Sequence, residues 1–510
     1  MRIALIDGTT GADFPPLGAL TLASLAKAAG AVVDLVSLPG PAERTAVARR
    51  LRNHDLVAFS TNCGAYPNAL LLARTLKTIH RRLPIVFGGP QATVTAAATV
   101  TAFPEVDVVV GGEAERSWPA LLAGLTAGRE DWRCVPGATW IQNGAVQSLP
   151  EADLLADLDA VPLPDYAAFP GTARGGTVPL EVGRGCPYGC TFCSTNTFFK
   201  RRFRMKSAGR IIADVTALAR QFGARHVDFI HDMFTVRRDL VVEIAGAMAR
   251  LPVGWNCSAR TDRLDDDLIR TIAASGCRGV YVGLEAGSRR LQRSLRKNLD
   301  VEAAMAVVRR CQAEGMGVTA SLIVGYPIET RADLRETLLC AFELARPHPS
   351  HDAQGPIRIQ LPFFAPMPAT PILAESGPLG FDGIIPSAVE IGSDTALEPD
   401  AVSMIMAHPD IFCAFLHAED TEVARADYIV LMQVLTALTD DPPLMAWLAA
   451  REGPRFVDHL LTPGLGRHRR PDQRATLEAV LAAYQDRPRR HPAPARPVPG
   501  PVPVLVSAAA

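Results

Sequence analysis

Three cysteines within eight residues constrain this chain more than any other stretch of it. Cys186, Cys190 and Cys193 follow the spacing C-x3-C-x2-C, and glycines at 183, 185 and 189 let the backbone curl around them. Thiolates at this spacing can face one point, as a soft metal centre requires. Three sulfur ligands are one fewer than a [4Fe-4S] cluster takes, so one iron stays open to a ligand from outside the protein. The spacing therefore predicts a catalytic iron–sulfur site.

Two other kinds of site use closely spaced cysteines. A structural zinc site takes paired C-x2-C or His blocks that close on a fourth ligand, and after Cys193 neither Cys nor His occurs until His226. A disulfide framework belongs to small secreted chains, whereas this chain has 510 residues, of which 48% are hydrophobic. Both alternatives fit the loop less well than a cluster does.

The loop, with Phe192 directly before Cys193, resembles the signature of radical S-adenosylmethionine (SAM) enzymes. In that family the open iron is chelated by the amino and carboxylate groups of SAM. An electron from the cluster then cleaves the C5′–S bond to give methionine and a 5′-deoxyadenosyl radical. The resemblance implies that Cys186, Cys190 and Cys193 hold the cluster and that Phe192 lies beside SAM. In such enzymes the protein binds and orients the cofactors, which carry the difficult chemistry.

Composition excludes several classes of partner. The chain is long enough for two to four domains, and its 52 Lys and Arg balance 53 Asp and Glu. Such balance favours neither nucleic acid nor a membrane surface as a partner. The first apolar run, residues 1–6, ends at Asp7 and is too short for a signal-peptide core. We therefore expect a cytoplasmic protein, in a reducing compartment that suits an oxygen-sensitive cluster.

Short apolar segments alternate with helical patterns over the first 110 residues. The expected strands are residues 2–6, 32–36, 56–60, 84–87 and 106–110. All-apolar strands separated by helices indicate a parallel sheet with both faces covered, which is a Rossmann-like or flavodoxin-like α/β domain. Residues 126–150 add a small β appendage, so that the domain spans residues 1–150. Its ligand should lie beyond the carboxyl ends of the strands.

The turns at these strand ends contain no G-x-G-x-x-G, which weighs against a dinucleotide site. They resemble instead the cobalamin-binding domain that precedes many radical SAM domains. The resemblance implies cobalamin contacts from the turns, namely Thr9, Thr10, Pro15, Leu17, Gly18, Ser60, Thr61, Tyr66, Gly88, Gly89, Gln91, Gly111, Gly112 and Glu113. The Asp-x-His-x-x-Gly motif of other cobalamin proteins is absent, and the residue beneath the cobalt is expected within residues 61–66. The alternative is a scaffold with an empty pocket.

Residues 151–176 are dense in Pro and Gly and are expected to form a linker. A second alternation of strands and helices fills residues 177–375. Its six expected strands are residues 178–182, 227–230, 254–258, 279–283, 318–324 and 357–361. Six such units match a partial (β/α)6 barrel, an open relative of the eight-stranded barrel whose chemistry lies at the carboxyl ends of the strands.

Charged and hydroxyl residues follow several of these barrel strands. The resemblance implies SAM contacts from Phe192, Asp232, Ser258, Arg260, Glu285 and Ser321. A zwitterionic, cationic ligand needs carboxylates near its ribose and amine and a cation near its carboxylate. Each of these charged residues could equally form a structural ion pair at the barrel rim, and no catalytic acid or base is assigned. The basic run at residues 200–206 is expected to be a solvated loop, or alternatively a contact for an electron donor or an acidic substrate.

The last third of the chain departs from the barrel pattern. Helical patterns near residues 398–418, 423–438, 442–450 and 474–485 predict a C-terminal helical domain over residues 376–486. The family resemblance implies that such helices cover the barrel mouth. Residues 487–510 are rich in proline and are expected to be disordered.

The resemblance as a whole implies a cobalamin-dependent radical SAM methyltransferase. Its cofactors would be a [4Fe-4S] cluster, SAM and methylcobalamin, and the methyl group would go to a carbon centre of a specialised natural product, either a small molecule or a peptide. A flavodoxin or ferredoxin is expected as electron donor. Two alternatives remain: a cobalamin-binding radical SAM enzyme that catalyses a rearrangement, cyclisation or oxidation, and a non-catalytic iron–sulfur sensor or scaffold.

Overall fold

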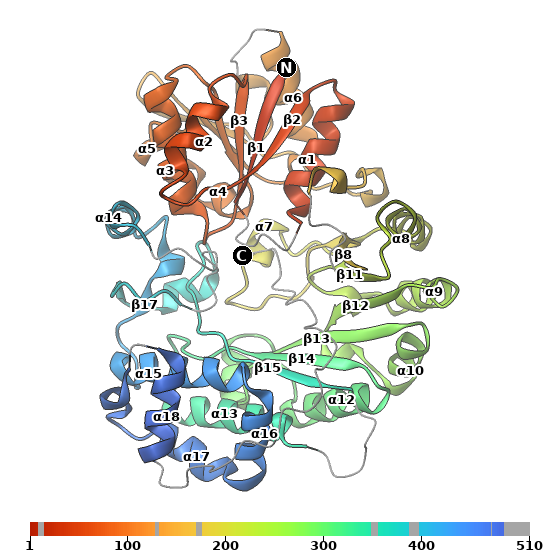
Figure 1. Cartoon of the computed structure of the whole chain (residues 1–510), viewed down its shortest axis with the longest axis vertical. Coiled ribbons are helices and arrows are strands. Elements are labelled where there is room, and N and C mark those ends of the chain that lie inside the picture. The colour runs from red at the N-terminus through yellow and green to blue at the C-terminus, as the bar shows by residue number, and fades with distance from the viewer. Residues whose placement is uncertain are drawn as a thin grey trace.

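The computed structural model describes residues 1–8, 15–127, 132–169, 176–347, 355–386, 397–470 and 472–483. Its N-terminal part is a seven-stranded sheet in the order β2-β1-β3-β4-β5-β6-β7, at the top of Figure 1. The strands are β1 (Arg2–Gly8), β2 (Val32–Ser37), β3 (Leu56–Thr61), β4 (Ile85–Gly88), β5 (Val108–Val110), β6 (Ala138–Gln142) and β7 (Ala145–Ser148). The first five strands pair in parallel, and the hairpin of β6 and β7 extends the sheet antiparallel from β5. The expected appendage is therefore part of the same sheet.

Helices cover both faces of this sheet, as its all-apolar strands predict. They are α1 (Leu17–Ala28), α2 (Arg44–Leu51), α3 (Tyr66–Ile79), α4 (Pro90–Val94), α5 (Ala96–Ala102) and α6 (Ala114–Thr126). Alternate strand residues point to opposite faces, so that Ala4 and Ile6 join the core beneath α3 while Ile3 and Leu5 join the core beneath α1 and α6. The doubly covered α/β domain expected from the sequence is confirmed.

The second sheet has six parallel strands in the order β15-β14-β13-β12-β11-β8. The strands are β8 (Thr177–Glu181), β11 (His226–Ile230), β12 (Gly254–Ala259), β13 (Cys277–Glu285), β14 (Gly317–Leu322) and β15 (Ile357–Gln360). The helices between them are α8 (Ala208–Phe222), α9 (Arg238–Met248), α10 (Asp266–Ala274), α11 (Arg289–Ser294), α12 (Val301–Ala313) and α13 (Arg331–Ala345). Because the order ends on β8 and β15, the barrel is open, as the partial (β/α)6 pattern predicts.

Local signals account for the bounds of these helices. The Ser207 hydroxyl caps the first turn of α8 by accepting from the Arg210 N–H, and Gly223 ends the helix with a left-handed φ of 66°. Thr330 and Asp333 form a reciprocal capping box at the start of α13. Both helices therefore begin and end where the sequence pattern places them.

The C-terminal region divides into two parts instead of forming one helical unit. The segment with α14 (Pro399–Ala407) and a short 3-10 turn (Cys413–Phe415) packs on the N-terminal domain, where Met404 and Phe412 share a core with Tyr66. The helix expected over 398–418 ends early because His408 precedes a proline, which disfavours helical backbone. Residues 487–510, expected to be disordered, lie outside the described residues.

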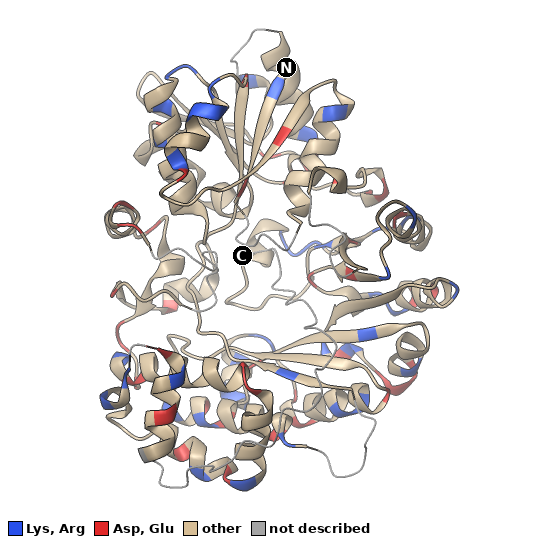
Figure 2. Ribbon diagram, in the orientation of Figure 1, with Lys and Arg blue, Asp and Glu red and all other residues tan. Residues whose placement is uncertain are grey.

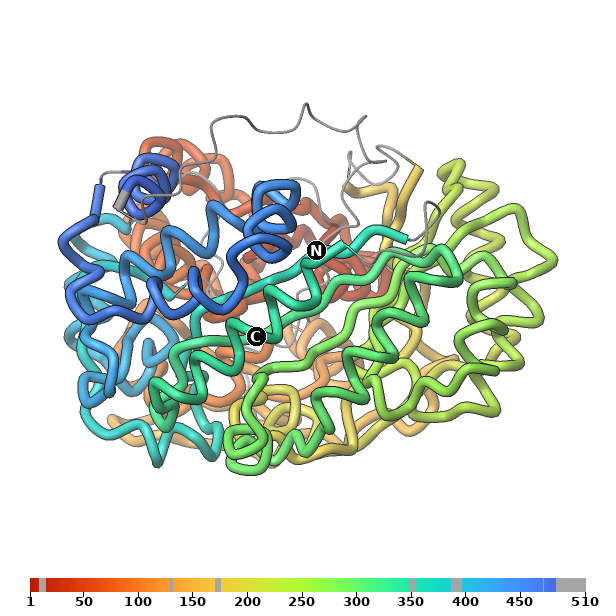
Figure 3. The backbone as a smooth tube through the Cα atoms, turned by 90° about the horizontal axis from the view of Figure 1, so that it is seen from below, coloured from red at the N-terminus to blue at the C-terminus, as the bar shows by residue number. Residues whose placement is uncertain are grey.

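The remaining helices pack beside the barrel, on α13 and β15. They are α15 (Arg425–Thr439), α16 (Pro442–Arg451), α17 (Gly453–Leu460) and α18 (Gln473–Ala483), of which α17 was not expected from the sequence. Figure 3 shows these blue helices on one side of the green barrel strands. They extend the barrel wall next to its last strand.

The expected linker is packed where the structure describes it. Tyr166 is fully buried, and its hydroxyl donates to the Pro179 carbonyl of β8 at 2.6 Å. Basic and acidic residues are interspersed along the coloured ribbon in Figure 2, in keeping with the balanced charge of the sequence. No helix among the described residues is both long enough and apolar enough to cross a bilayer.

Candidate active site between the two sheets

The cysteine loop begins where β8 ends and is closed by side-chain contacts from the next strand. A two-residue strand, β9 (Gly183–Arg184), pairs antiparallel with β10 (Arg204–Met205), and the loop runs between them. Asp232, two residues after the end of β11, accepts from the Gly185 N–H at 2.7 Å and from the Thr195 hydroxyl at 3.1 Å. Asp232 therefore ties both ends of the loop, and the SAM contact predicted for it remains a proposal.

The three thiols of the loop interact with one another. Burial raises the pKa of Cys186 to about 11 and that of Cys193 to about 12, and the neighbouring Cys190 contributes to both increases. Burial also raises the pKa of Cys190, against the opposing charges of Lys297 and Arg260. Buried thiolates at this place need a nearby positive charge to stabilise them. The iron ions of an iron–sulfur cluster supply that charge when the thiolates bind them.

The donor set fits a cluster better than a single ion. Within the described residues, no three His, Cys, Asp or Glu side chains are arranged to hold one metal ion. A [4Fe-4S] cluster makes a different demand, because each thiolate binds a different iron. Three thiols on one loop at C-x3-C-x2-C spacing offer one ligand to each of three irons, and the charges of Lys297 and Arg260 act on Cys190.

A buried ion pair lies behind the cysteine loop. Glu285, at the end of β13, accepts from the Lys297 ammonium at 3.0 Å, and the two side chains are only 12% and 7% exposed. Glu285 has a left-handed φ of 67°, which is rare for a residue with a side chain. A Cβ at Gly283 would lie 2.2 Å from the Glu285 Oε1, so the glycine makes room for the carboxylate. Backbone strain at this position is typical of a functional site.

Lys297 was not anticipated from the sequence. Burial lowers its pKa, but the charges of Glu285 and Cys190 outweigh burial and raise the pKa above its ordinary value. Its carbonyl accepts from the Arg260 guanidinium at 2.8 Å. No spacing rule marks a lysine in the turn after α11, so only the folded chain shows that it belongs to the site.

Arg260 connects the third barrel strand to the cysteine loop. Its guanidinium lies over the Tyr188 ring, 4.0 Å from the centroid, and is paired with Asp262 at 3.0 Å. It is only 3% exposed, and its charge opposes the rise that burial causes in the pKa of Cys190. Glu285, Arg260 and the unanticipated Lys297 thus gather at the thiols, with the charges that a zwitterionic ligand needs.

The other expected SAM residues are tied to the barrel scaffold. The Ser258 hydroxyl donates to the His231 carbonyl, and Ser321 hydrogen-bonds to the half-buried Tyr281. The Phe192 ring packs edge-on against Tyr326, with centroids 5.7 Å apart. Their SAM contacts stay predictions.

The turns of the N-terminal sheet meet at its carboxyl edge. Gly89 has a φ of 99°, and a Cβ there would lie 2.5 Å from the Thr61 carbonyl oxygen. The Thr61 hydroxyl donates to the Gly88 carbonyl at 2.9 Å, and Gly18 lies near Ser60, with a Cβ 3.9 Å from its hydroxyl. Gly111 and Gly112, after β5, pack against the Glu151 side chain. This glycine-lined edge is the surface expected to take cobalamin.

Pro15 and Leu17 lie at the start of α1, where Pro15 is buried and Leu17 packs against the barrel core. Thr9 and Thr10 lie outside the described residues.

Tyr66 and Gln91 are placed away from an open edge. Tyr66 is fully buried, and its hydroxyl is 2.8 Å from that of Thr99. The Gln91 amide donates to the Ile411 carbonyl at 2.7 Å. Both side chains therefore point toward the C-terminal segment with α14, Tyr66 against Phe412 and Gln91 against Ile411.

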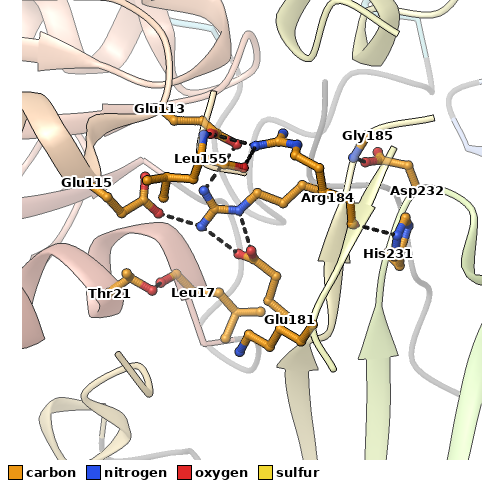
Figure 4. Close-up of polar contacts among 12 residues, drawn as sticks. Leu17, Thr21, Glu113, Glu115, Leu155, Glu181, Arg184, Gly185, His231 and Asp232 are labelled. Atoms are coloured by element: carbon orange, nitrogen blue, oxygen red, sulfur yellow. Dashed lines mark hydrogen bonds and ion pairs between the residues drawn. The ribbon is translucent and has the colours of Figure 1, made fainter. Parts of the chain in front are cut away.

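Glu113, another expected cobalamin contact, lies at the interface between the two sheets. Its carboxylate pairs with Arg204 at 2.8 Å and Arg184 at 3.2 Å, and Arg184 also binds Glu115 and Glu181 (Figure 4). Burial raises the pKa of Glu113, but the two arginines outweigh it and hold the pKa below its ordinary value. Since Glu113 follows β5 and Arg184 follows β8, the carboxyl edges of the two sheets face each other.

The basic run at residues 200–206 is solvated only in part, since Lys200, Arg201 and Arg202 are exposed whereas Lys206 is buried. Arg204 binds Glu113, Lys200 pairs with Glu151 at 2.7 Å, and Lys206, only 2% exposed, pairs with Asp214 at 3.0 Å. Three of its cations therefore hold structural contacts.

Two family models match this chain. The radical SAM superfamily matches residues 180–341, and the B12 binding domain matches residues 3–122. An uncharacterized methyltransferase of Pyrococcus horikoshii is 29% identical over 364 residues, which cover 68% of this chain and 78% of that protein. An anaerobic magnesium-protoporphyrin IX monomethyl ester cyclase of Rubrivivax gelatinosus is 25% identical, over 56% of this chain and 53% of that protein.

A solved structure shares the whole arrangement. It is the radical S-adenosylmethionine methyltransferase TsrM from Kitasatospora setae, with cobalamin and a [4Fe-4S] cluster bound. The TM-score is 0.63 at 15% identity, and the match covers 95% of this chain and 99% of that one. At this identity the likeness shows a common fold.

Proposed function

The chain is a radical SAM protein with a B12-binding domain, and on that premise we propose that it is a cobalamin-dependent methyltransferase acting on a carbon centre of a specialised natural product. A small molecule is the favoured substrate class, since TsrM, which shares the fold, has been solved with tryptophan bound. The P. horikoshii relative, which covers most of this chain, is described as a methyltransferase.

One observation carries the proposal: the contacts of Arg184 with Glu113 and Glu115 make the carboxyl edges of the two sheets face each other. Parallel α/β sheets bind ligands at that edge. A methyl donor held on the glycine-lined edge and a substrate held at the barrel mouth would therefore share one enclosed space. Enclosure matters because radical chemistry needs the reacting atoms close together and dry.

The bound cofactors would supply a methyl group from methylcobalamin and, from the [4Fe-4S] cluster and SAM, the radical that activates the substrate carbon. Cys186, Cys190 and Cys193 would hold the cluster. Glu285, Lys297 and Arg260 have the charges to orient SAM beside it. The glycine-lined edge with the turns at Gly88–Gly89 and Gly111–Gly112 would hold cobalamin.

The test requires no natural substrate. Reduced, cobalamin-loaded protein is incubated anaerobically with SAM carrying a CD3 group, and the corrinoid and nucleoside products are analysed by mass spectrometry. The proposal predicts CD3-cobalamin with S-adenosylhomocysteine, together with 5′-deoxyadenosine. A Cys190→Ser variant should lose deoxyadenosine and keep CD3-cobalamin. Absence of CD3-cobalamin in the wild type would contradict a methyltransferase.

A second candidate is a cobalamin-binding radical SAM enzyme that cyclises or oxidises its substrate. It is favoured by the similarity to the R. gelatinosus cyclase, which also spans both domains. The same assay separates the two functions, because such an enzyme would release deoxyadenosine without transferring the CD3 group to cobalamin.

A further inference from the structure

The cysteine loop reaches the protein surface on one side. Pro187, Tyr188 and Gly189 are partly exposed, and each is bonded in the chain to one of the liganding cysteines or lies one residue from one. A protein-bound electron carrier that touched these residues would lie within two residues of Cys186 or Cys190 along the chain. Reductive cleavage of SAM under the proposed function takes one electron, which the chain itself does not supply.

Exposed arginines flank this part of the loop. Arg201 donates to the Pro187 carbonyl at 3.2 Å, and Arg263 donates to the Tyr188 hydroxyl at 2.6 Å. Arg202, the next residue along the chain, is also exposed. We call Arg201, Arg202 and Arg263 the arginine face. Both Lys200 and Arg201 have left-handed φ angles, 52° and 57°, so the backbone is strained where it carries Arg201 to the loop.

The charge of the arginine face is not neutralised within the protein. The neighbouring cations are paired, Lys200 with Glu151 and Arg260 with Asp262. Across the described part of the chain, no carboxylate forms an ion pair with Arg201, Arg202 or Arg263. Asp262 is the carboxylate beside the face, and Arg260 already binds it. A local excess of positive charge thus stands out on a chain whose net charge is −1.

We propose that the arginine face is the docking surface for an acidic one-electron carrier protein, of the flavin or iron–sulfur kind. The inference rests on the proposed function, which requires the electron. The carrier gives up one electron and no atom, and that electron is consumed when the C5′–S bond of SAM breaks. Complementary charge is the main means by which such transient partners find and orient on each other.

The first measurement is binding, and it uses the full chain with its cluster reconstituted anaerobically. A flavodoxin is the probe, and its Kd is measured by titration calorimetry for the wild type and for Arg201→Glu/Arg263→Glu. The control, Arg116→Glu/Arg250→Glu, makes the same charge change at exposed arginines on α6 and just after α9. We expect the Kd to rise about tenfold or more in the first variant alone, and the difference to shrink at high salt. An equal Kd in all three proteins would overturn the inference.

The second measurement compares reductants in the reconstituted enzyme. With flavodoxin, its reductase and NADPH, the double variant should form deoxyadenosine about tenfold more slowly than the wild type. With dithionite, a small reductant that needs no docking, the two should agree within about twofold. An equal loss with both reductants would show that the arginines only support the loop, and would overturn the inference. Should the wild type form no deoxyadenosine with dithionite, the proposed function fails, and the binding measurement still decides whether the face recruits an acidic carrier.

An acidic substrate is the other occupant that this charge could attract. In that case the double variant would bind flavodoxin as the wild type does, and the KM for substrate would rise with either reductant. Arg202→Glu separates charge from loop contacts, because no side-chain hydrogen bond joins Arg202 to the described cysteine loop. It should weaken flavodoxin binding in the same direction as the double variant, and unchanged binding would count against a docking role for the face.

Discussion

Glu285 and Lys297 show how much of the site depends on single residues. The carboxylate and the ammonium are 3.0 Å apart, and both are almost fully buried. A buried ion pair adds little stability by itself, but removing one partner leaves an unpaired charge in a place that water does not reach. The pair also lies beside Cys190, so its charges act on the cluster ligands as well as on each other.

Glu285→Gln should therefore destabilise the fold by about 3 kcal/mol, because it leaves the Lys297 ammonium without a counter-charge. Lys297→Met in the same background removes the stranded charge and should recover most of that loss. Urea denaturation of the single and double variants measures both effects. Additive losses in the double variant would show that the two residues do not act as a pair.

At the residue scale, the sequence identifies ligands that chemistry forces into a fixed spacing. Cys186, Cys190 and Cys193 must lie on one short loop, so their spacing can be recognised in the sequence alone. Lys297 and Arg184 are different, because each acts on residues far away in the chain and no local spacing records that. Tyr66 shows a different limit, since the pattern after a strand does not say whether a side chain faces the core or the ligand edge; its side chain is buried, and its cobalamin contact stays a prediction.

The turn between β4 and α4 tolerates few substitutions, because its backbone conformation and its packing both require glycine. Gly89 has φ 99° and ψ 177°, a conformation available almost only to glycine, and its backbone lies against Thr61. Gly144 also has a left-handed φ, 77°, but a Cβ there would have no atom within 4 Å. An alanine at Gly144 would therefore cost only backbone strain, whereas an alanine at Gly89 would cost backbone strain and a steric clash.

Gly89→Ala should cost about 3 kcal/mol or more, from strain and overpacking together, whereas Gly144→Ala should cost about 1 kcal/mol. The first variant should also weaken cobalamin binding, because the displaced turn is part of the glycine-lined edge. Thermal unfolding and a corrinoid titration test the two statements. Equal losses of stability in the two variants would mean that an alanine at position 89 does not clash with the Thr61 backbone.

A buried carboxyl group connects the turn after β14 to α15. Glu329 is buried and accepts from the Gly325 N–H at 2.7 Å and from the Tyr428 hydroxyl at 3.2 Å. Burial raises its pKa from 4.5 to about 8, with Asp333 adding to the rise and the Gly325 and Tyr428 hydrogen bonds and Arg290 opposing it. The folded state thus holds this proton at pH values where the unfolded chain has released it.

Between about pH 4.5 and 8 the folded protein therefore binds more protons at Glu329 than the unfolded protein does, and stability from this residue falls as the pH rises through that window. Glu329→Gln should flatten that part of the profile and be the more stable protein at pH 8.5. Glu336→Gln, an exposed change on α13, should keep the wild-type profile. Unfolding temperatures from pH 5 to 8.5 make the comparison, and parallel profiles for all three proteins would contradict it.

Element boundaries follow local chemistry closely in the barrel. Helices with a polar N-cap and a glycine or capping box, such as α8 and α13, lie where the sequence places them. The C-terminal region was harder to predict because helical periodicity does not say which neighbour a helix packs on. The segment with α14 turned to the N-terminal domain, which the pattern of Met404 and Phe412 alone does not reveal.

For the whole molecule, the contacts of Arg184 decide how the two domains meet. This buried arginine binds Glu113 and Glu115 from one domain and Glu181 from the other, directly before the cysteine loop. The fold of each domain could be predicted from strand patterns. Their relative placement could not, because it depends on such long-range pairs.

Arg184→Met should leave the carboxylates of Glu113, Glu115 and Glu181 without the positive charge that they share. We expect this to destabilise the interface by about 3 kcal/mol. By calorimetry we expect one unfolding transition in the wild type and two in Arg184→Met, and we expect this variant to bind cobalamin more weakly. Arg238→Met, which removes an exposed pair with Asp265, is the matched control and should change neither. An unsplit transition in Arg184→Met would argue that other contacts fix the domains.

The account as a whole depends on what metals the chain binds. The direct measurement is iron, cobalt and zinc per chain after anaerobic reconstitution with iron, sulfide and cobalamin, for the wild type, Cys190→Ser and Cys134→Ser. We predict about four irons and one cobalt in the wild type and in Cys134→Ser, a change at an exposed cysteine outside the loop, and loss of iron but not of cobalt in Cys190→Ser. Zinc in place of iron, or iron that survives in Cys190→Ser, would contradict the account.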